Sequence, residues 1–142
     1  MENTDLRLNK MCAEQKARID AKGFKRENIP TYLMLTVSEL SEALEADRKN
    51  RHADTKAFEE NMPIVFTAPG CYPMPSVTID EYKAVFKAQF EKHIKDTFED
   101  EIADAFLRLM HLCGELGIDI EKHILLKMAY NELRPVRHGK AY

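Results

Sequence analysis

The sequence predicts an all-α fold, a bundle of four to five helices that is completed by oligomerisation. Apolar residues recur at intervals of three and four along most of the chain, which is the period of an amphipathic helix. Residues that begin and end helices separate these stretches, and no segment shows the strict alternation of a half-buried strand. At 142 residues the chain fits a single domain, residues 1–142, with room for a sizeable core.

Two helices are expected in the first 50 residues. The first runs from about Asp5 to Lys22, and Gly23 follows as a stop because glycine readily adopts the left-handed conformation at a helix C-terminus. The second runs from near Pro30 to Asn50, since proline suits the first turn of a helix. Its apolar side chains form a narrow stripe of Leu33, Val37, Leu40 and Leu44.

The middle of the chain is expected to be an irregular insertion followed by an extra helix. Residues 51–77 are rich in proline, so they predict a loop or short extended structure. Thr78 and Glu81 have the spacing of a capping box, which predicts a helix over about residues 79–95. Near Asp96 the pattern allows either a break or a continuous helix.

The helix expected from Phe98 to Leu116 is apolar over most of its circumference. Such a helix must be covered on several sides, as in a bundle or an oligomer. Gly117 ends it, and Asp119 can cap a last helix that Pro135 prevents from continuing. The polar residues are confined to a strip of Glu101, Asp104, Arg108, His111 and Glu115.

Composition argues against several classes of protein. With 21 basic and 24 acidic residues, the chain lacks the positive charge that grips a nucleic-acid backbone, so no nucleic-acid polymer is expected as a partner. The three cysteines form no Cys-x-x-Cys pair, which favours a reducing compartment and disfavours structural zinc. The first residues lack a signal-peptide pattern and no apolar stretch reaches membrane-spanning length, so we expect a cytoplasmic protein without a membrane partner.

The most informative pattern is a pair of acidic couplets, Glu39 with Glu42 and Glu101 with Asp104. Residues three apart lie side by side on a helix, so each couplet presents two carboxylates on one face. If the two faces meet, four carboxylates share one place with few neutralising partners. Hard divalent cations, Mg²⁺ above all, prefer oxygen ligands of this kind, and phosphate-bearing substrates often arrive with Mg²⁺ attached.

Acidic pairs at this spacing are also common on solvated faces, and the pattern alone favours that interpretation. Two features oppose it. Leu35 lies between Glu39 and Glu42 on the helical wheel, so that face is not purely polar. The second couplet occupies the narrow strip left by a broad apolar arc, and partly buried carboxylates need cations.

Three further polar residues line one face of the last helix. Lys127, Asn131 and Arg134 follow one another at intervals of four and three residues, and a basic tail, residues 135–142, comes next. Lysine and arginine favour helix C-termini for dipole reasons alone. In a chain with four candidate metal carboxylates, the same groups are also candidate phosphate ligands.

Together these blocks resemble the MazG-like all-α nucleoside triphosphate pyrophosphohydrolases. The similarity lies in the order and internal spacing of residues 37–44, 101–104, 116–119 and 127–135, and it covers more than a third of the chain. The closing Lys-x-x-x-Asn-x-x-Arg adds specificity, because a single Glu-x-x-Glu is a weak signal.

The resemblance implies a helical bundle that works as a homodimer or homotetramer and hydrolyses a (deoxy)nucleoside triphosphate to the monophosphate and pyrophosphate. It implies one or more Mg²⁺ ions, for which Mn²⁺ can substitute. The predicted metal-binding and catalytic residues are Glu39, Glu42, Glu101 and Asp104. The predicted substrate-binding residues are Lys127, Asn131 and Arg134, near the phosphates or the sugar.

Two features depart from the family pattern. The family helix usually reads Glu-x-x-Glu-x-x-Glu, and its first position is Thr36 here, so either Glu39 and Glu42 form the working couplet or the site has one ligand fewer. The family also joins its acidic helices by a short turn, whereas 58 residues separate Glu42 from Glu101. This insertion could be a lid, an oligomer contact or a pocket wall.

Two other classes of helical protein compete with this interpretation. A di-iron carboxylate bundle needs Glu-x-x-His motifs, and no histidine of this chain has a glutamate three residues before it. A non-catalytic helical oligomer, a degenerate family member in which Thr36 marks decay of the site, stays as the alternative. Titration with Mg²⁺ separates the two, because only a metal enzyme is stabilised by the ion through mass action.

Overall fold

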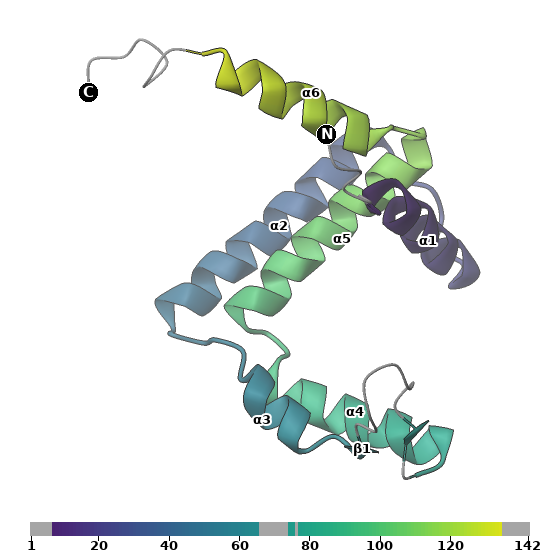
Figure 1. The fold of residues 1–142 in the computed structure, drawn as a ribbon, viewed down its shortest axis with the longest axis vertical. Coiled ribbons are helices and arrows are strands. Elements are labelled where there is room, and N and C mark those ends of the chain that lie inside the picture. Colours follow the sequence, from purple (N-terminus) through teal and green to yellow (C-terminus); the bar gives the residue numbers. More distant parts are fainter. Residues whose placement is uncertain (1–6, 66–73, 76, 135–142) are drawn as a thin grey trace. The chain divides into compact units, whose positions relative to one another are not determined.

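The computed structural model describes residues 7–65, 74–75 and 77–134, and these residues are mainly helical (Figure 1). The helices are α1 (Leu8–Ala21), α2 (Ile29–Arg48), α3 (Thr55–Glu60), α4 (Ile79–His93), α5 (Phe98–Leu116) and α6 (Ile120–Glu132). Two short strands, β1 (Ile64–Val65) and β2 (Met74–Pro75), pair antiparallel with Ile64 opposite Pro75. The predicted all-α class is confirmed. None of the helices in the described ranges combines the length and apolarity that crossing a membrane requires.

The chain forms two compact units, and helices α2 and α5 each contribute residues to both. Unit 1 comprises residues 1–35 and 106–142, and unit 2 comprises residues 36–105. All four predicted metal carboxylates therefore belong to unit 2. The three predicted substrate-binding residues belong to unit 1.

In unit 1, helix α1 packs closely on α5. A Cβ atom added to Gly114 would lie only 2.5 Å from the carbonyl oxygen of Cys12, so only glycine allows the two backbones this approach. The Cys12 thiol is buried and hydrogen-bonds that of Cys113, and burial raises the pKa of both thiols. The third cysteine, Cys71, lies outside the described residues.

Polar contacts join the start of α1 to the start of α6 within the same unit. The Asn9 side-chain amide donates a hydrogen bond of 2.7 Å to Asp119, and the Asn9 backbone N–H donates one of 3.1 Å to Glu121. These bonds link the N-terminal ends of two helices that are more than 100 residues apart in the sequence.

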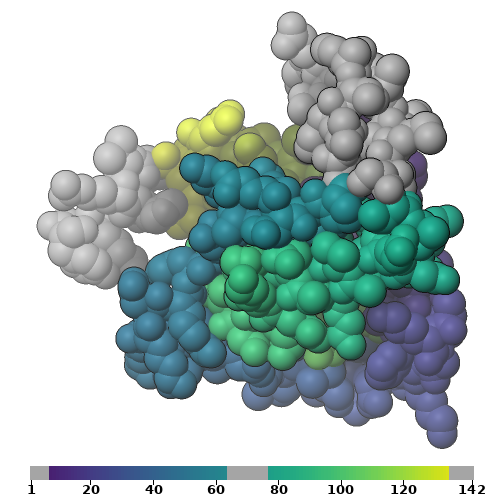
Figure 2. All heavy atoms as spheres, turned by 90° about the horizontal axis from the view of Figure 1, so that it is seen from below, coloured from purple at the N-terminus to yellow at the C-terminus, as the bar shows by residue number. Residues whose placement is uncertain are grey.

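In unit 2, α3 lies along α4 (Figures 1 and 2). The contact is aromatic: the Phe58 and Phe86 rings meet edge to face with centroids 5.4 Å apart, and Phe86 stacks on Phe90 at 6.0 Å. Helix α3 was not predicted, because residues 51–77 were expected to be loop or extended. The helix is capped because the Asp54 side chain accepts a hydrogen bond from the Ala57 N–H. The Asp54 N–H in turn donates a hydrogen bond to the His93 carbonyl, which positions the cap at the end of α4. Including α3, the described residues form six helices rather than four to five.

The predicted signals at the start of α4, the end of α5 and the start of α6 are confirmed. Thr78 and Glu81 form both hydrogen bonds of a capping box at the start of α4, and Asp119 caps α6 by accepting from the Lys122 N–H. Gly117 ends α5 with a φ of +62°. The alternative left open at Asp96 is resolved as a break, because α4 ends at His93 and Asp96 adopts a φ of +59°.

Several large apolar side chains of α5 and α6 are exposed. On α5, Phe106 is 59% exposed and Leu109 is 41% exposed, so the described residues do not cover this helix on several sides. On α6, no residue is fully buried among those described, and Leu126 and Met128 are both more than half exposed. The described residues thus leave these apolar faces open to solvent.

Candidate functional site

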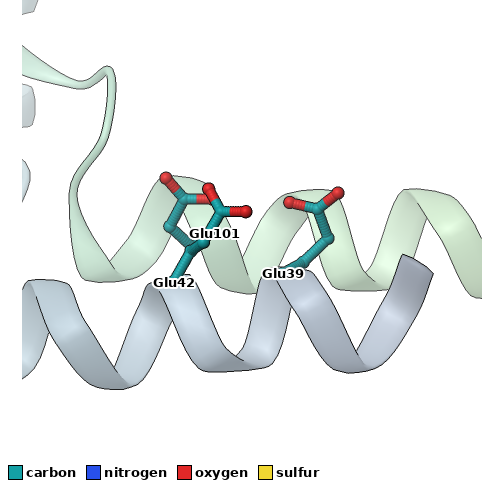
Figure 3. A group of neighbouring side chains, drawn as sticks. All are labelled: Glu39, Glu42 and Glu101. Carbon is teal, nitrogen blue, oxygen red and sulfur yellow. The ribbon is translucent and has the colours of Figure 1, made fainter. Parts of the chain in front are cut away.

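Three of the four predicted metal carboxylates meet in unit 2. Glu39 and Glu42 come from α2 and Glu101 comes from α5, and one oxygen from each lies within 4.8 Å of the others. Figure 3 shows the three side chains extending to the same side of the two helices, with the Glu42 and Glu101 carboxylates next to each other and Glu39 further along α2. We refer to these three residues as the carboxylate cluster.

Two small residues are buried close to the carboxylate cluster. Ala43 follows Glu39 by four residues and Ala105 follows Glu101 by four, so each alanine lies one turn from an acid on the same face. Ala43 is 2% exposed and Ala105 is 4% exposed. A larger side chain at either buried position would force its surroundings to shift.

The carboxylate cluster is half buried and strongly electronegative. Glu39 and Glu101 are buried, whereas Glu42 is exposed. Burial raises the pKa of Glu101 above its ordinary value, and the negative charges of Glu42, Asp100, Asp104 and Glu39 raise it further. The folded chain therefore holds like charges together, which favours binding of a cation.

The turn that carries Glu101 is anchored by the segment after α2. The Phe98 N–H donates a hydrogen bond of 3.0 Å to the Arg51 carbonyl. Glu99 accepts hydrogen bonds from the Ala53 N–H at 2.8 Å and from His52 at 3.0 Å, which lowers the pKa of Glu99. These bonds fix the start of α5, and hence Glu101, relative to the end of α2.

A small hollow of about 180 Å³ adjoins the carboxylate cluster. It is lined by Glu42, Glu45, Arg51, Asp96 and Glu101. Two of its acids already have lysine partners, since Lys49 lies 2.9 Å from Glu45 and Lys95 lies 3.2 Å from Asp96. The other two, Glu42 and Glu101, belong to the carboxylate cluster. No sequence pattern points to Arg51 or to this hollow, apart from the end of a helix close to the first acidic couplet.

The fourth predicted ligand, Asp104, is not part of the carboxylate cluster. It lies three residues beyond Glu101 on α5 and is exposed. Its charge still contributes to raising the pKa of Glu101, so it is electrostatically coupled to the cluster. Thr36, which stands where the family pattern has a glutamate, is buried one turn before Glu39.

The predicted substrate-binding residues are exposed in unit 1. Lys127 and Asn131 lie on α6, and Arg134 follows the end of that helix. The Lys127 ammonium lies 5.1 Å from the centre of the Tyr130 ring. The basic tail, residues 135–142, lies outside the described residues. A role for these groups in substrate binding stays a prediction.

Comparisons with known proteins add no relative from which function could be transferred. No protein family, no curated protein and no solved structure matches this chain. The resemblance to the MazG-like enzymes therefore depends on the sequence motifs alone. The carboxylate cluster is the structural feature that bears most directly on function.

Proposed function

We propose that this chain is a Mg²⁺-dependent nucleoside triphosphate pyrophosphohydrolase. The observation that carries the proposal is the meeting of Glu39, Glu42 and Glu101, whose oxygens lie within 4.8 Å of one another although 58 residues separate Glu42 from Glu101. The reaction class comes from the resemblance of the surrounding motifs to the MazG-like family.

The donor set suits a hard divalent cation. Carboxylate oxygens are ligands that Mg²⁺ and Mn²⁺ accept readily, and Mg²⁺ keeps several waters when only a few protein oxygens bind it. With Glu39 and Glu101 buried and Glu42 exposed, one side of the cluster is open to water and to phosphate oxygens. Glu39, Glu42 and Glu101 would hold one or more ions, and Asp104 is the expected fourth ligand.

The proposed reaction breaks the α–β phosphoanhydride bond of a (deoxy)nucleoside triphosphate and releases the monophosphate and pyrophosphate. When bound, Mg²⁺ neutralises phosphate charge and lowers the pKa of a coordinated water. The chain itself holds the carboxylates in fixed positions, and one of the four acids accepts the proton of the attacking water. Lys127, Asn131 and Arg134, which belong to unit 1, stay the predicted substrate-binding residues on the strength of the sequence motif.

We also propose that the working form is a homodimer or homotetramer. Support comes from the exposed apolar side chains of α6, which a second copy of the chain would remove from water. They include Leu125, Leu126, Met128 and Tyr130, all exposed by 45% or more. Sedimentation equilibrium at micromolar concentration should find an oligomer, and a chain that stays monomeric would contradict this part of the proposal.

An assay of pyrophosphate release from the common ribo- and deoxyribonucleoside triphosphates tests the reaction. We expect at least one of them to be cleaved in Mg²⁺ and none in EDTA. Glu101→Gln and Asp104→Asn should each abolish turnover with the fold retained. Glu59→Gln is the matched control, because it removes one exposed carboxylate from α3 of the same unit. Unchanged rates in the first two variants would overturn the proposed site.

The alternative, a non-catalytic helical oligomer, is favoured by the same exposed apolar side chains of α6. It predicts association without turnover and without stabilisation by Mg²⁺. Thermal unfolding in EDTA and in millimolar Mg²⁺ separates the two functions, because an ion that binds the folded state raises the unfolding temperature.

A further inference from the structure

The hollow beside the carboxylate cluster is lined by one positively charged side chain, that of Arg51. Lys49 pairs with Glu45 and Lys95 pairs with Asp96 at the edges of the hollow. The charge of the Arg51 guanidinium acts on Glu45 as well, since it contributes, after Lys49 and Arg48, to lowering the pKa of that carboxyl. With the two lysine pairs set aside, the lining consists of Glu42, Glu101 and Arg51.

The backbone of Arg51 is held from both sides. Its N–H donates a hydrogen bond of 2.9 Å to the Ala46 carbonyl of α2, and its carbonyl accepts one of 3.0 Å from the Phe98 N–H of α5. The preceding residue, Asn50, adopts a φ of +52°, which turns the chain away from the helix axis. Arg51 is thus fixed by the same two helices that carry the carboxylate cluster, and its side chain starts from a defined position.

Charge decides what this hollow can accept. Without a cation, Glu42 and Glu101 repel phosphate and attract the Arg51 side chain. Once divalent cations neutralise the cluster, Arg51 is left as a positive group with five N–H donors beside the metal ligands. A guanidinium in that position matches phosphate oxygens, which it binds in bidentate fashion.

We propose that Arg51 is a substrate-binding residue that contacts a phosphate of the nucleoside triphosphate whose other oxygens face the carboxylate cluster. This inference rests on the proposed function and deepens it. Arg51 differs from the predicted phosphate ligands Lys127 and Arg134, because it lies in the same compact unit as the carboxylates.

The test compares Arg51→Gln with Arg48→Gln. Arg48 is an exposed arginine three residues earlier, at the end of α2, and it does not line the hollow. Both variants lose one positive charge at the same end of the helix. We expect Arg51→Gln to raise KM and to lower kcat/KM on the order of 10- to 100-fold, the usual worth of hydrogen bonds to a charged group. Arg48→Gln should stay within about twofold of the wild type.

A second readout separates phosphate binding from a structural role. Mg²⁺ binding, followed by calorimetry without nucleotide, should be unchanged or tighter in Arg51→Gln, because a competing positive charge is gone. Arg51→Lys keeps the charge but loses the planar fork, so its kcat/KM should lie between those of the wild type and Arg51→Gln.

The outcomes distinguish this inference from the proposed function. If the wild type cleaves nucleotides and Arg51→Gln matches Arg48→Gln, the inference is wrong and the proposed function stands. If Arg51→Gln loses Mg²⁺ binding or thermal stability together with activity, Arg51 has a structural role and the inference is again wrong. If the wild type cleaves no nucleoside triphosphate, the proposed function and the inference fail together.

Discussion

Glu101→Gln should change stability in opposite directions with and without Mg²⁺. Glu101 is 7% exposed and shares the cluster with Glu39 and Glu42, at oxygen separations of up to 4.8 Å. Two unit charges at that distance repel by about 3.5 kcal/mol at an effective dielectric constant of about 20, and by about 0.9 kcal/mol in bulk water. Glutamine keeps the size of the side chain and removes the charge.

In EDTA, Glu101→Gln should therefore raise the free energy of unfolding by about 1–2 kcal/mol, since burial and the neighbouring carboxylates both disfavour the charged form. In Mg²⁺ the order should reverse. An ion present at about 100 times its Kd stabilises the wild type by about 2.7 kcal/mol, and the variant that lacks a ligand should lose most of this gain.

Urea unfolding followed by circular dichroism at pH 7.5, with and without Mg²⁺ and at one fixed protein concentration, measures both effects. Glu59→Gln, which removes an exposed carboxylate outside the cluster, should behave like the wild type under both conditions. The reasoning is refuted if Glu101→Gln is less stable than the wild type in EDTA, or if Mg²⁺ stabilises both proteins equally.

Three further predictions concern the structure that supports the site. Gly114→Ala should lower the free energy of unfolding by about 1–3 kcal/mol, because the new Cβ would meet the Cys12 carbonyl at 2.5 Å and this overpacking outweighs the better helix propensity of alanine; equal or higher stability in urea would contradict the close α1–α5 contact. Thr78→Ala should cost about 1 kcal/mol through loss of the capping box of α4, and an unchanged urea midpoint would show that α4 does not need its cap. The Asn9 amide and the Lys122 N–H hold the pKa of Asp119 below its usual value, so its charged form stabilises the fold above the unfolded pKa and this contribution is lost as pH falls through the lower folded pKa. Wild type should accordingly exceed Asp119→Asn in unfolding temperature at pH 7, with the difference shrinking towards about pH 3; a difference independent of pH would argue against this assignment.

Most helix boundaries could be predicted from the sequence because their signals are local. Thr78 and Glu81 are three residues apart, and Asp119 needs only the N–H of Lys122 to cap α6. Gly117 ends α5 through its own backbone conformation. Helix α3 escaped prediction because it is only six residues long and lies in a stretch rich in proline, where its Asp54 cap and its aromatic contact with α4 outweigh composition.

The candidate site could be predicted only in part. Spacing alone places Glu39 beside Glu42 on one helix face, and Glu101 beside Asp104 on another. Nothing within either helix determines that Glu101 joins Glu39 and Glu42 while Asp104 is exposed outside the group. The anchoring of α5 by Arg51, His52 and Ala53 is equally invisible in a helical wheel.

The sequence by itself determined the helical class, most of the helix ends and the identity of the acids that could bind a cation, since each depends on residues within one or two turns. Tertiary structure decided which of those acids share a place. It also put Arg51 in the hollow next to Glu42 and Glu101. The reason is that the distance between α2 and α5 at this place depends on how two helices with 58 residues between Glu42 and Glu101 pack, and no local pattern records that distance.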